Sequence, residues 1–323
     1  MDLQNVYQEL KHDLQEVEQG LTQSIQTDHP YLHKTSSHLL LAGGKRIRPI
    51  FVLLSGHFGN FDLEKLKRVA ITLELIHMAT LVHDDIIDDA KTRRGKLTVK
   101  EKWDNEIAMV TGDYIFASAL KEISKIQIPE VHQTLSSTIL EVCRGEIEQI
   151  RDHFQLNLSV KRYFHRIKRK TALLMAISCK LGAVVCQASP EIVRKLYAYG
   201  YYVGMAFQMI DDVLDFTGDE KTLGKPAGSD LKQGNVTLPV VYLLAHGSEK
   251  EKAILTEYLK SKGKKASLSQ VIPIVKNSKG IPYTINLAKR YLGKALQAIE
   301  PLPAIRQKQS MHQITEFILQ RSY

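Results

Sequence analysis

The chain has 323 residues, 44% of them hydrophobic and 24% charged, which is ample for a large buried core. Its 44 Lys and Arg outweigh 35 Asp and Glu, giving a formal net charge of +9. This charge is compatible with nucleic acid, an anionic membrane surface or anionic small molecules, and it does not choose among them. No apolar run could span a bilayer and no signal peptide is visible, so we expect a cytoplasmic protein without a transmembrane segment.

Helical periodicity extends over almost the whole sequence. A first helix is predicted from one apolar stripe and is expected to end at Pro30; the stripe contains Leu3, Val6, Leu10, Leu14, Val17, Leu21 and Ile25. Gly43-Gly44 indicates a helix end, and Pro49 suits the first turn of the next helix. Further helices are predicted over 66–90, 106–126, 131–153, 160–187, 191–217 and 236–246.

Period-two alternation bounded by turns is essentially missing, so no sheet is expected. Neither a low-complexity linker nor a tandem repeat divides the chain. The prediction is therefore an all-α fold with a single large helical domain over residues 1–323. Cys143, Cys179 and Cys186 lack metal-ligand spacing and are expected to be buried, reduced thiols.

A first aspartate cluster lies in the segment 73–89, which reads LELIHMATLVHDDIIDD. On a helix, His77, Thr80, Asp84 and Asp88 fall on one narrow stripe of an otherwise apolar surface. Carboxylates one turn apart repel each other, and buried charge is costly unless it is paired. Mg²⁺ is usually held by one or two carboxylates together with substrate phosphates. An acidic helix end neutralised by the basic residues at 91–94 is the alternative interpretation.

A second cluster, GMAFQMIDDVLD over 204–215, repeats the DDxxD pattern. Gln208, Asp211 and Asp215 share one helical face. Two such faces could hold one polyanion through several metal ions. An acidic helix end is again the alternative, but the helix dipole disfavours it, and two copies favour a functional reading.

Three basic segments accompany the aspartates. In GGKRIRP, Lys45 and Arg48 lie between a glycine cap and a helix start, where anions bind favourably. Neutralisation of the preceding helix end explains these cations equally well. Arg93-Arg94 follows the first aspartate cluster, and adjacent arginines suit two neighbouring anions. The segment 168–171 reads KRKT, for which a basic surface patch is the simpler explanation in isolation.

In this order, GGKRIRP, HDDIIDD with RRG, KT, FQMIDDVLD and GKPAGSDLKQGNVTLP resemble the trans-isoprenyl diphosphate synthase family over nearly the whole chain. Within it, the pattern is most similar to the catalytic subunits, component II, of two-component bacterial heptaprenyl diphosphate synthases. The resemblance implies helices around a deep central cavity, a Mg²⁺ cofactor, and isopentenyl and allylic diphosphates as substrates, with farnesyl diphosphate as primer. It also implies a smaller regulatory subunit, component I, in a heterodimer, and no nucleic-acid partner.

The resemblance also implies a role for each motif residue. Isopentenyl diphosphate would be held by Lys45, Arg48, His77 and Arg94. Mg²⁺ would be held by Asp84, Asp88, Asp211 and Asp215. The allylic diphosphate would be bound by Arg93, Lys170, Thr171, Gln208 and Lys225. Catalysis is expected to depend most directly on Asp84, Asp88, Arg93, Lys170 and Asp211.

Some positions depart from the family pattern. Asn235 stands where many relatives have lysine, so it is not counted as a phosphate ligand, and Lys232 is left as the substitute cation. Gly145-Glu146 replaces a frequent Gly-Gln pair. At the position of Ala79, short-chain relatives carry an aromatic residue that forms the pocket floor. Ala79 with Thr80 and Ile76 therefore predicts a longer product, heptaprenyl diphosphate, for a quinone such as menaquinone.

Other functions remain as alternatives. Synthases of hexaprenyl to octaprenyl products share the same motifs. A class I terpene cyclase also ionises a diphosphate with aspartate-bound Mg²⁺, but it needs no acceptor site, and the basic segment at 45–48 argues against it. A nucleic-acid-binding or scaffold protein explains the positive charge but leaves two acidic clusters unexplained.

Overall fold

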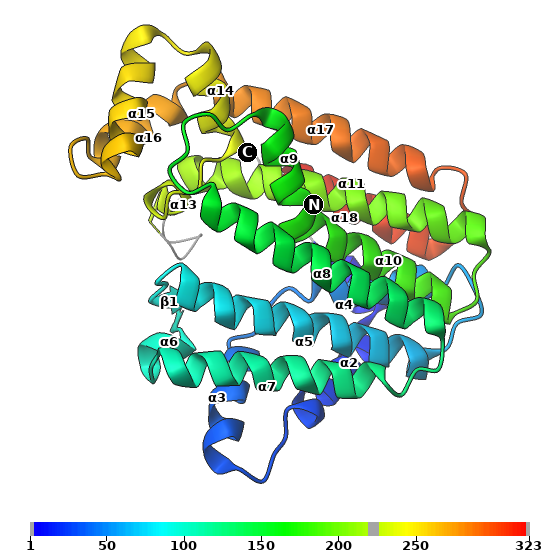
Figure 1. The fold of residues 1–323 in the computed structure, drawn as a ribbon. Coiled ribbons are helices and arrows are strands. Elements are labelled where there is room, and N and C mark those ends of the chain that lie inside the picture. The colour runs from blue at the N-terminus through cyan, green and yellow to red at the C-terminus, as the bar shows by residue number, and fades with distance from the viewer. Residues whose placement is uncertain (1–2, 219–225, 321–323) are drawn as a thin grey trace.

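The computed structural model describes residues 3–218 and 226–320 (Figure 1). Within this part of the chain almost every element is helical, which confirms the all-α prediction. The elements of the N-terminal half are α1 Gln4–Glu9, α2 Lys11–Ser24, α3 Pro30–Leu40, α4 Ile47–Gly56, α5 Leu63–Ile87, β1 Thr92–Arg93, β2 Lys96–Leu97, α6 Val99–Lys102, α7 Asn105–Ile123 and α8 Pro129–Arg151. Those of the C-terminal half are α9 Val160–Ile167, η1 Lys168–Ala172, α10 Leu173–Val185, α11 Pro190–Thr217, α13 Ser229–Lys232, α14 Leu238–His246, α15 Glu249–Ser261, α16 Leu268–Lys276, α17 Gly280–Ile299 and α18 Arg306–Gln320.

Local capping explains where the long helices begin. The side chain of Asp62 accepts a hydrogen bond from the backbone N–H of Lys65 at the start of α5. Ser189 caps α11 in the same way, and Pro190 occupies its first turn, where a missing N–H has no cost. These signals are written in the sequence, and the predicted helices therefore lie close to their observed bounds.

The first predicted helix is divided in two. Leu10 leaves helical geometry and separates α1 from α2, although both helices keep the same stripe buried. Pro30 does not end this helix, because α2 stops at Ser24 and Pro30 is the first residue of α3. Proline is tolerated at that position since its missing N–H would have no partner there.

The prediction of no sheet is wrong at one point. Thr92–Arg93 and Lys96–Leu97 pair as a two-stranded antiparallel hairpin directly after the first aspartate cluster. Arg94 and Gly95 form its turn with φ of 53° and 74°, the left-handed conformation that two-residue hairpin turns require. Arg93 thus lies in the first strand of the hairpin and Arg94 in its turn.

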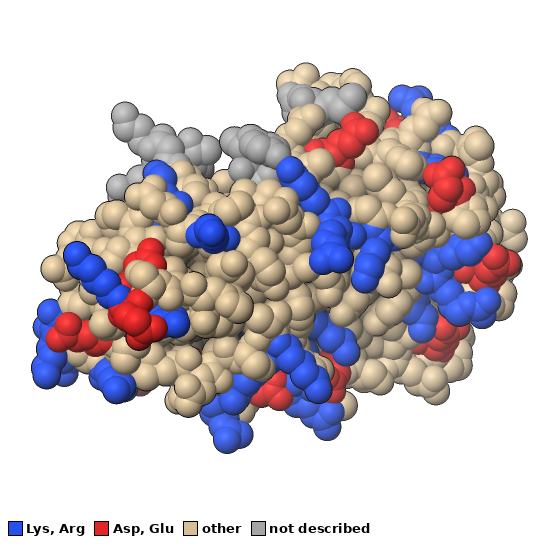
Figure 2. Space-filling view, turned by 90° about the horizontal axis from the view of Figure 1, so that it is seen from above, with Lys and Arg blue, Asp and Glu red and all other residues tan. Residues whose placement is uncertain are grey.

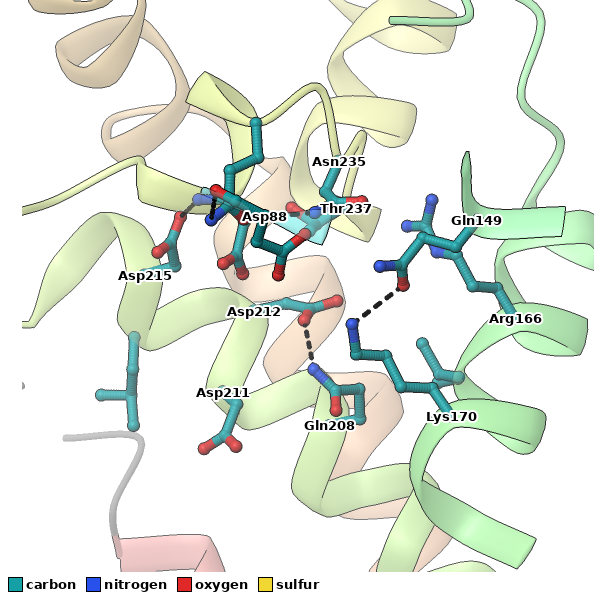
Figure 3. Close-up of a pocket in the computed structure, with 14 residues that line it drawn as sticks. Asp88, Gln149, Arg166, Lys170, Gln208, Asp211, Asp212, Asp215, Asn235 and Thr237 are labelled. Carbon is teal, nitrogen blue, oxygen red and sulfur yellow. Dashed lines mark hydrogen bonds between the residues drawn. The ribbon is translucent and has the colours of Figure 1, made fainter. Parts of the chain in front are cut away.

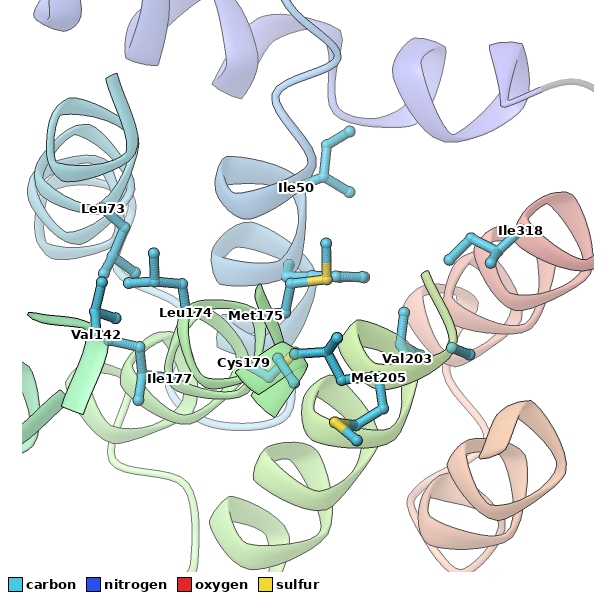
Figure 4. Close-up of a cluster of buried hydrophobic side chains, with 14 of the residues drawn as sticks. Ile50, Leu73, Val142, Leu174, Met175, Ile177, Cys179, Val203, Met205 and Ile318 are labelled. Atoms are coloured by element: carbon cyan, nitrogen blue, oxygen red, sulfur yellow. The ribbon is translucent and has the colours of Figure 1, made fainter. Parts of the chain in front are cut away.

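The core is built around α4 and α10, in both of which most side chains are buried. A Cβ atom on Gly182 would lie 2.3 Å from the carbonyl oxygen of Val52, so glycine lets the two helices approach closely. Figure 4 shows side chains of α5, α8, α10, α11 and α18 meeting in this core. Cys179 and Cys186 are buried as expected, whereas Cys143 is exposed on α8, contrary to the prediction.

The predicted helix over 160–187 is interrupted by a π-helical turn, η1, at Lys168–Ala172. Such turns insert one residue into a helix and are frequent at functional sites. A Cβ atom on Gly204 of α11 would lie 2.6 Å from the Cα atom of Ala172, so α11 packs directly against the turn. This contact places the KT motif beside the second aspartate cluster.

The C-terminal ends of α5 and α11 lie at the same end of the molecule, next to the hairpin and α13 (Figure 1). Both aspartate clusters are at these ends. None of the helices in the described ranges has both the length and the apolar character that a membrane crossing requires. Over the face in Figure 2, Lys and Arg are mixed with Asp and Glu.

Candidate active site

Two adjoining cavities occupy the end of the molecule where α5 and α11 terminate. The aspartate cavity has a volume of about 310 Å³ and is lined by Asp88, Gln149, Arg166, Lys170, Gln208, Asp211, Asp212, Asp215, Asp230, Gln233, Asn235 and Thr237, among others. The basic cavity, of about 670 Å³, is lined by residues that include Lys45, Arg46, Arg48, Glu74, His77, Thr80, Asp84, Arg93, Arg94, Glu146, Lys170, Thr171, Gln208 and Asp211. Lys170, Gln208 and Asp211 line both, so the cavities adjoin each other at these three residues.

The carboxylates of the first cluster divide into two kinds. Asp85 is buried, accepts a hydrogen bond from Nε of Arg93 at 2.8 Å, and forms an ion pair with its Nη2 at 2.7 Å. Asp89 pairs with Lys100. Asp84 and Asp88 line the cavities instead, and no residue of the described chain donates a hydrogen bond to either carboxylate. The pair on the predicted stripe is therefore available to a ligand.

Burial makes the carboxyl groups of Asp84 and Asp88 weaker acids than usual. It raises the pKa of Asp84 to about 7, with Glu146 and Asp88 adding to the effect and Lys170 opposing it. Burial likewise raises the pKa of Asp88. The pKa of Lys170 is raised because Glu146, Asp84 and Asp88 together outweigh its burial. An added cation would therefore strongly favour the ionised form of both aspartates.

The second cluster is held by neutral donors. Tyr163 donates to Asp212 at 2.6 Å, and Nε2 of Gln208 donates to the other carboxylate oxygen at 2.9 Å. Thr171 in turn donates to Gln208 at 2.6 Å. This chain of bonds links the π turn to α11 and fixes Gln208 between the two cavities (Figure 3). Lys170 donates to Gln149 of α8 at 3.0 Å.

Asp215 is tied to the segment that follows the helix. Its carboxylate accepts a hydrogen bond from Ser229 at 2.9 Å and one from the backbone N–H of Asp230 at 3.3 Å. Asp230 lines the same cavity and contributes a further carboxylate. Asp211, the first aspartate of the cluster, lines both cavities.

The donor set suits Mg²⁺ shared with a substrate. In the described residues, no three His, Cys, Asp or Glu converge into a metal site formed by protein alone. Mg²⁺ is commonly bound by only one or two carboxylates plus substrate phosphates, and it prefers the oxygen ligands that Asp84, Asp88, Asp211 and Asp215 offer. These residues fit such a metal, provided that an anionic ligand completes its coordination.

The basic cavity gathers the cations predicted for isopentenyl diphosphate. Lys45, Arg48, His77 and Arg94 all line it. Burial, followed by the charges of Arg48 and Arg94, lowers the pKa of His77 well below its ordinary value, so this ring is neutral near pH 7. Four described acids line the same cavity: Glu74, Asp84, Glu146 and Asp211. Of these, Glu74 is buried and forms an ion pair with Arg46.

Arg46 supports the loop that carries these cations. It adopts a left-handed φ of 48° at the start of α4. Its guanidinium is buried between Glu74, at 3.1 Å, and Glu18 of α2, at 3.2 Å. The loop is thereby fixed to both α2 and α5, with Lys45 and Arg48 on either side of the anchor.

Three predicted residues line neither cavity, and a fourth lies outside the described residues. Thr80 lines the basic cavity, but Ala79 and Ile76 are buried in the core and do not. Lys225 lies outside the described residues. Lys232 is exposed and lines neither cavity, so it does not occupy the position expected of a substitute for the family lysine.

Sequence reasoning missed several cavity residues. Asp230 could have been noticed, since it stands inside the quoted motif GKPAGSDLKQGNVTLP. Glu146 stands out in the sequence only as a departure from the Gly-Gln pair that is frequent in the family. Gln149, Arg166 and Glu74 carry no local signal, because their position depends on how α5, α8 and α9 pack.

Comparisons with known proteins identify the family of this chain. Residues 29–275 match the family described as Polyprenyl synthetase. The chain belongs to this family. It is 49% identical, over its full length and 92% of the relative, to heptaprenyl diphosphate synthase component 2 of Bacillus subtilis (strain 168).

Solved structures give the same assignment. Heptaprenyl diphosphate synthase from Staphylococcus aureus matches with a TM-score of 0.90 and 40% identity, covering 100% of this chain and 99% of that one. A polyprenyl synthase from Caulobacter crescentus CB15, complexed with calcium and isoprenyl diphosphate, matches with a TM-score of 0.95 and 28% identity, covering 100% and 98%. The predicted resemblance is confirmed, and the chain is a prenyltransferase.

Proposed function

We propose that this prenyltransferase condenses isopentenyl diphosphate onto an allylic diphosphate in a Mg²⁺-dependent, head-to-tail trans reaction. The observation that carries the proposal is the meeting of two aspartate-bearing helix ends at Lys170, directly beside a cavity lined by Lys45, Arg48 and Arg94. Two sites for diphosphates therefore adjoin each other. A terpene cyclase needs only the first of them.

The side chains divide the work of the reaction. When bound, Mg²⁺ supplies charge neutralisation for the departing diphosphate. Lys170 and Thr171 stabilise the negative charge that develops as the allylic C–O bond breaks, the kind of electrostatic effect that dominates such catalysis. Lys45, Arg48 and Arg94 hold isopentenyl diphosphate so that its double bond attacks the allylic carbon. The new C–C bond leaves a cation, which loses a proton to the departing diphosphate and forms the next allylic double bond.

The apolar wall of the basic cavity gives the growing chain a place to lie. Leu81, Val142, Leu174 and Met175 line it, and the core in Figure 4 continues behind them. We assign heptaprenyl diphosphate, a quinone side-chain precursor, as the product, because Bacillus and Staphylococcus relatives bear that name.

A second, smaller component completes the proposed enzyme, since the Bacillus relative is named component 2. Exposed apolar side chains on which such a partner could pack are present on α7 and on α8. Its exposed side chains include Met109, Val110 and Leu120 of α7 and Leu140, Ile147 and Ile150 of α8. Apolar patches of this kind on a protein surface commonly mark protein interfaces.

Product analysis tests the proposal. The purified chain is incubated with farnesyl and isopentenyl diphosphates and Mg²⁺, with and without the candidate second component, and the products are separated by mass spectrometry. We expect heptaprenyl diphosphate with both components and little long-chain product with this chain alone. Full heptaprenyl synthesis by the chain alone would exclude the required partner. A cyclic hydrocarbon product would exclude the condensation itself.

A further inference from the structure

One end of the aspartate cavity contains buried polar atoms without partners. Nη1 of Arg166, Oδ1 of Asn235 and Oγ1 of Thr237 form no hydrogen bond within the described part of the chain. All three residues line this cavity, and Figure 3 shows them with the aspartates in view. An unsatisfied buried polar atom is costly and rare in native proteins, so three in one place indicate a bound group.

Arg166 is a buried cation without a direct counter-ion. Its side chain extends from α9 and is only 5% exposed. Nη2 donates to the carbonyl oxygen of Val236 at 2.6 Å, and the guanidinium lies 5.6 Å from the ring centre of Tyr163. Within the described residues, Arg166 forms no ion pair with a carboxylate. The remaining N–H groups on Nη1 are therefore available to an anion.

The start of α14 adds to this positive environment. Thr237 is the N-cap residue of this nine-residue helix, yet its hydroxyl does not accept a bond from the first turn, as N-cap threonines usually do. The residue lines the cavity, and its Oγ1 is buried without a hydrogen-bond partner. The bond from Arg166 to Val236 holds the guanidinium beside this helix end, where backbone N–H groups and the dipole favour anions.

We propose that Arg166, Thr237 and the first turn of α14 bind phosphate oxygens of the allylic diphosphate, with Arg166 about one helical turn before Lys170. The assignment rests on the proposed function and adds residues to its allylic site. Arg166 supplies fixed positive charge at a place where Asn235 provides none. Arginine suits this role because its planar fork donates to two phosphate oxygens while Nη2 stays bonded to the backbone.

Binding of inorganic pyrophosphate in the presence of Mg²⁺, measured by calorimetry on the full chain, tests this site. Arg166→Gln should weaken binding by about 10- to 100-fold, the size expected for a hydrogen bond to a charged group. Arg166→Lys, which keeps the charge, should lose less. Lys161→Gln removes an exposed charge from the same helix and should leave the affinity unchanged. Binding of isopentenyl diphosphate alone should match wild type in every variant.

A second pair of variants separates phosphate binding from a purely structural role. Thr237→Val keeps the shape but removes the hydroxyl, and should weaken pyrophosphate binding by about 3- to 10-fold. Adding Asn235→Lys to Arg166→Gln returns a cation to the cavity and should restore most of the affinity. If the only role of Arg166 is its bond to the backbone of Val236, Asn235→Lys should not restore pyrophosphate affinity.

The outcomes distinguish failure of the proposed phosphate site from failure of the proposed function. Wild-type affinity for pyrophosphate in Arg166→Gln overturns the proposed site. If Arg166→Gln does not fold, wild-type affinity in both Arg166→Lys and Thr237→Val overturns it. An equal loss of isopentenyl diphosphate binding, without rescue by Asn235→Lys, overturns it as well. If the wild-type chain neither binds pyrophosphate with Mg²⁺ nor condenses the substrates, the proposed function itself fails.

Discussion

The two aspartate clusters share the pattern DDxxD, but the structure holds their carboxylates differently. In both, the second aspartate is buried and bonded: Asp85 to the cation Arg93, Asp212 to the neutral donors Tyr163 and Gln208. The last aspartates differ more. Asp88 ends α5 and faces the cavity, whereas Asp215 lies within α11 and accepts bonds from the 229–230 segment.

The two clusters therefore differ in whether their carboxylates must release hydrogen bonds before they can bind a ligand. Asp84 and Asp88 can accept a metal ion without releasing any bond formed by the described residues. Asp215 must share or exchange its bonds with Ser229 and Asp230 to do the same. On the proposed function, metal binding at the second cluster would therefore be coupled to the position of α13, whereas the first cluster would bind a metal without such a rearrangement.

The largest effect is expected from the carboxylate that faces the ligand. Asp84→Ala should lower kcat by about 100- to 1000-fold, the loss typical for removal of a group that stabilises transition-state charge. Asp85→Asn, its neighbour bonded to Arg93, should cost less. Steady-state kinetics at saturating Mg²⁺, with circular dichroism to verify the helices, measures both. Near wild-type turnover in Asp84→Ala would end its assignment as a ligand.

The two hairpin arginines provide the next test. Arg94 points into the basic cavity, so Arg94→Ala should raise KM for isopentenyl diphosphate by about 10- to 100-fold. Arg93 is bonded to the first cluster, so Arg93→Ala should act mainly on the allylic substrate. Loss of transition-state contacts would appear in kcat as well. Identical changes for both substrates would contradict the division of roles.

The comparison also shows what the sequence could reveal. Both clusters, and the helices that carry them, follow from spacing and from local caps such as Asp62 and Ser189. The π turn at 168–172 could not be predicted, because it depends on Gly204 packing against Ala172. The contact of Asp215 with Asp230 and the direction of Arg166 likewise depend on tertiary packing.

Product length can be tested at equivalent places on the two helices. Ala79 and Ala206 each lie five residues before the first aspartate of their cluster, about 7.5 Å along the helix, and both are buried. Ala79→Phe should shorten the products to farnesyl or geranylgeranyl diphosphate if the tail runs along α5. Ala206→Phe adds the same volume and should only destabilise the core, by about 1–3 kcal/mol. Mass spectrometry measures product length and thermal unfolding measures stability. An active Ala79→Phe variant with unchanged products would show that the floor of the product pocket is not at Ala79.

The smallest effect concerns the metal-free protein and pH. Burial raises the pKa of both Asp84 and Asp212 to about 7, above the usual value of 3.8. The folded state therefore binds these protons more tightly than the unfolded state, and each group lowers stability as pH rises from about 4 to 7.

An asparagine mimics the protonated acid and is insensitive to pH. Without Mg²⁺ at pH 8, Asp84→Asn should therefore raise the free energy of unfolding by about 1 kcal/mol, and this gain should vanish as the pH falls to 4. Asp212→Asn should gain less, because the carboxylate of Asp212 accepts one bond on each oxygen, from Tyr163 and from Gln208, and an asparagine NH₂ group cannot accept the second of them. Added Mg²⁺ at pH 8 favours the ionised acid and should stabilise the wild-type chain more than Asp84→Asn. Urea unfolding between pH 4 and 8, with and without Mg²⁺, measures how the free energy of unfolding depends on pH and on the metal. Equal increases in the two variants would contradict the difference in hydrogen bonding between the two clusters.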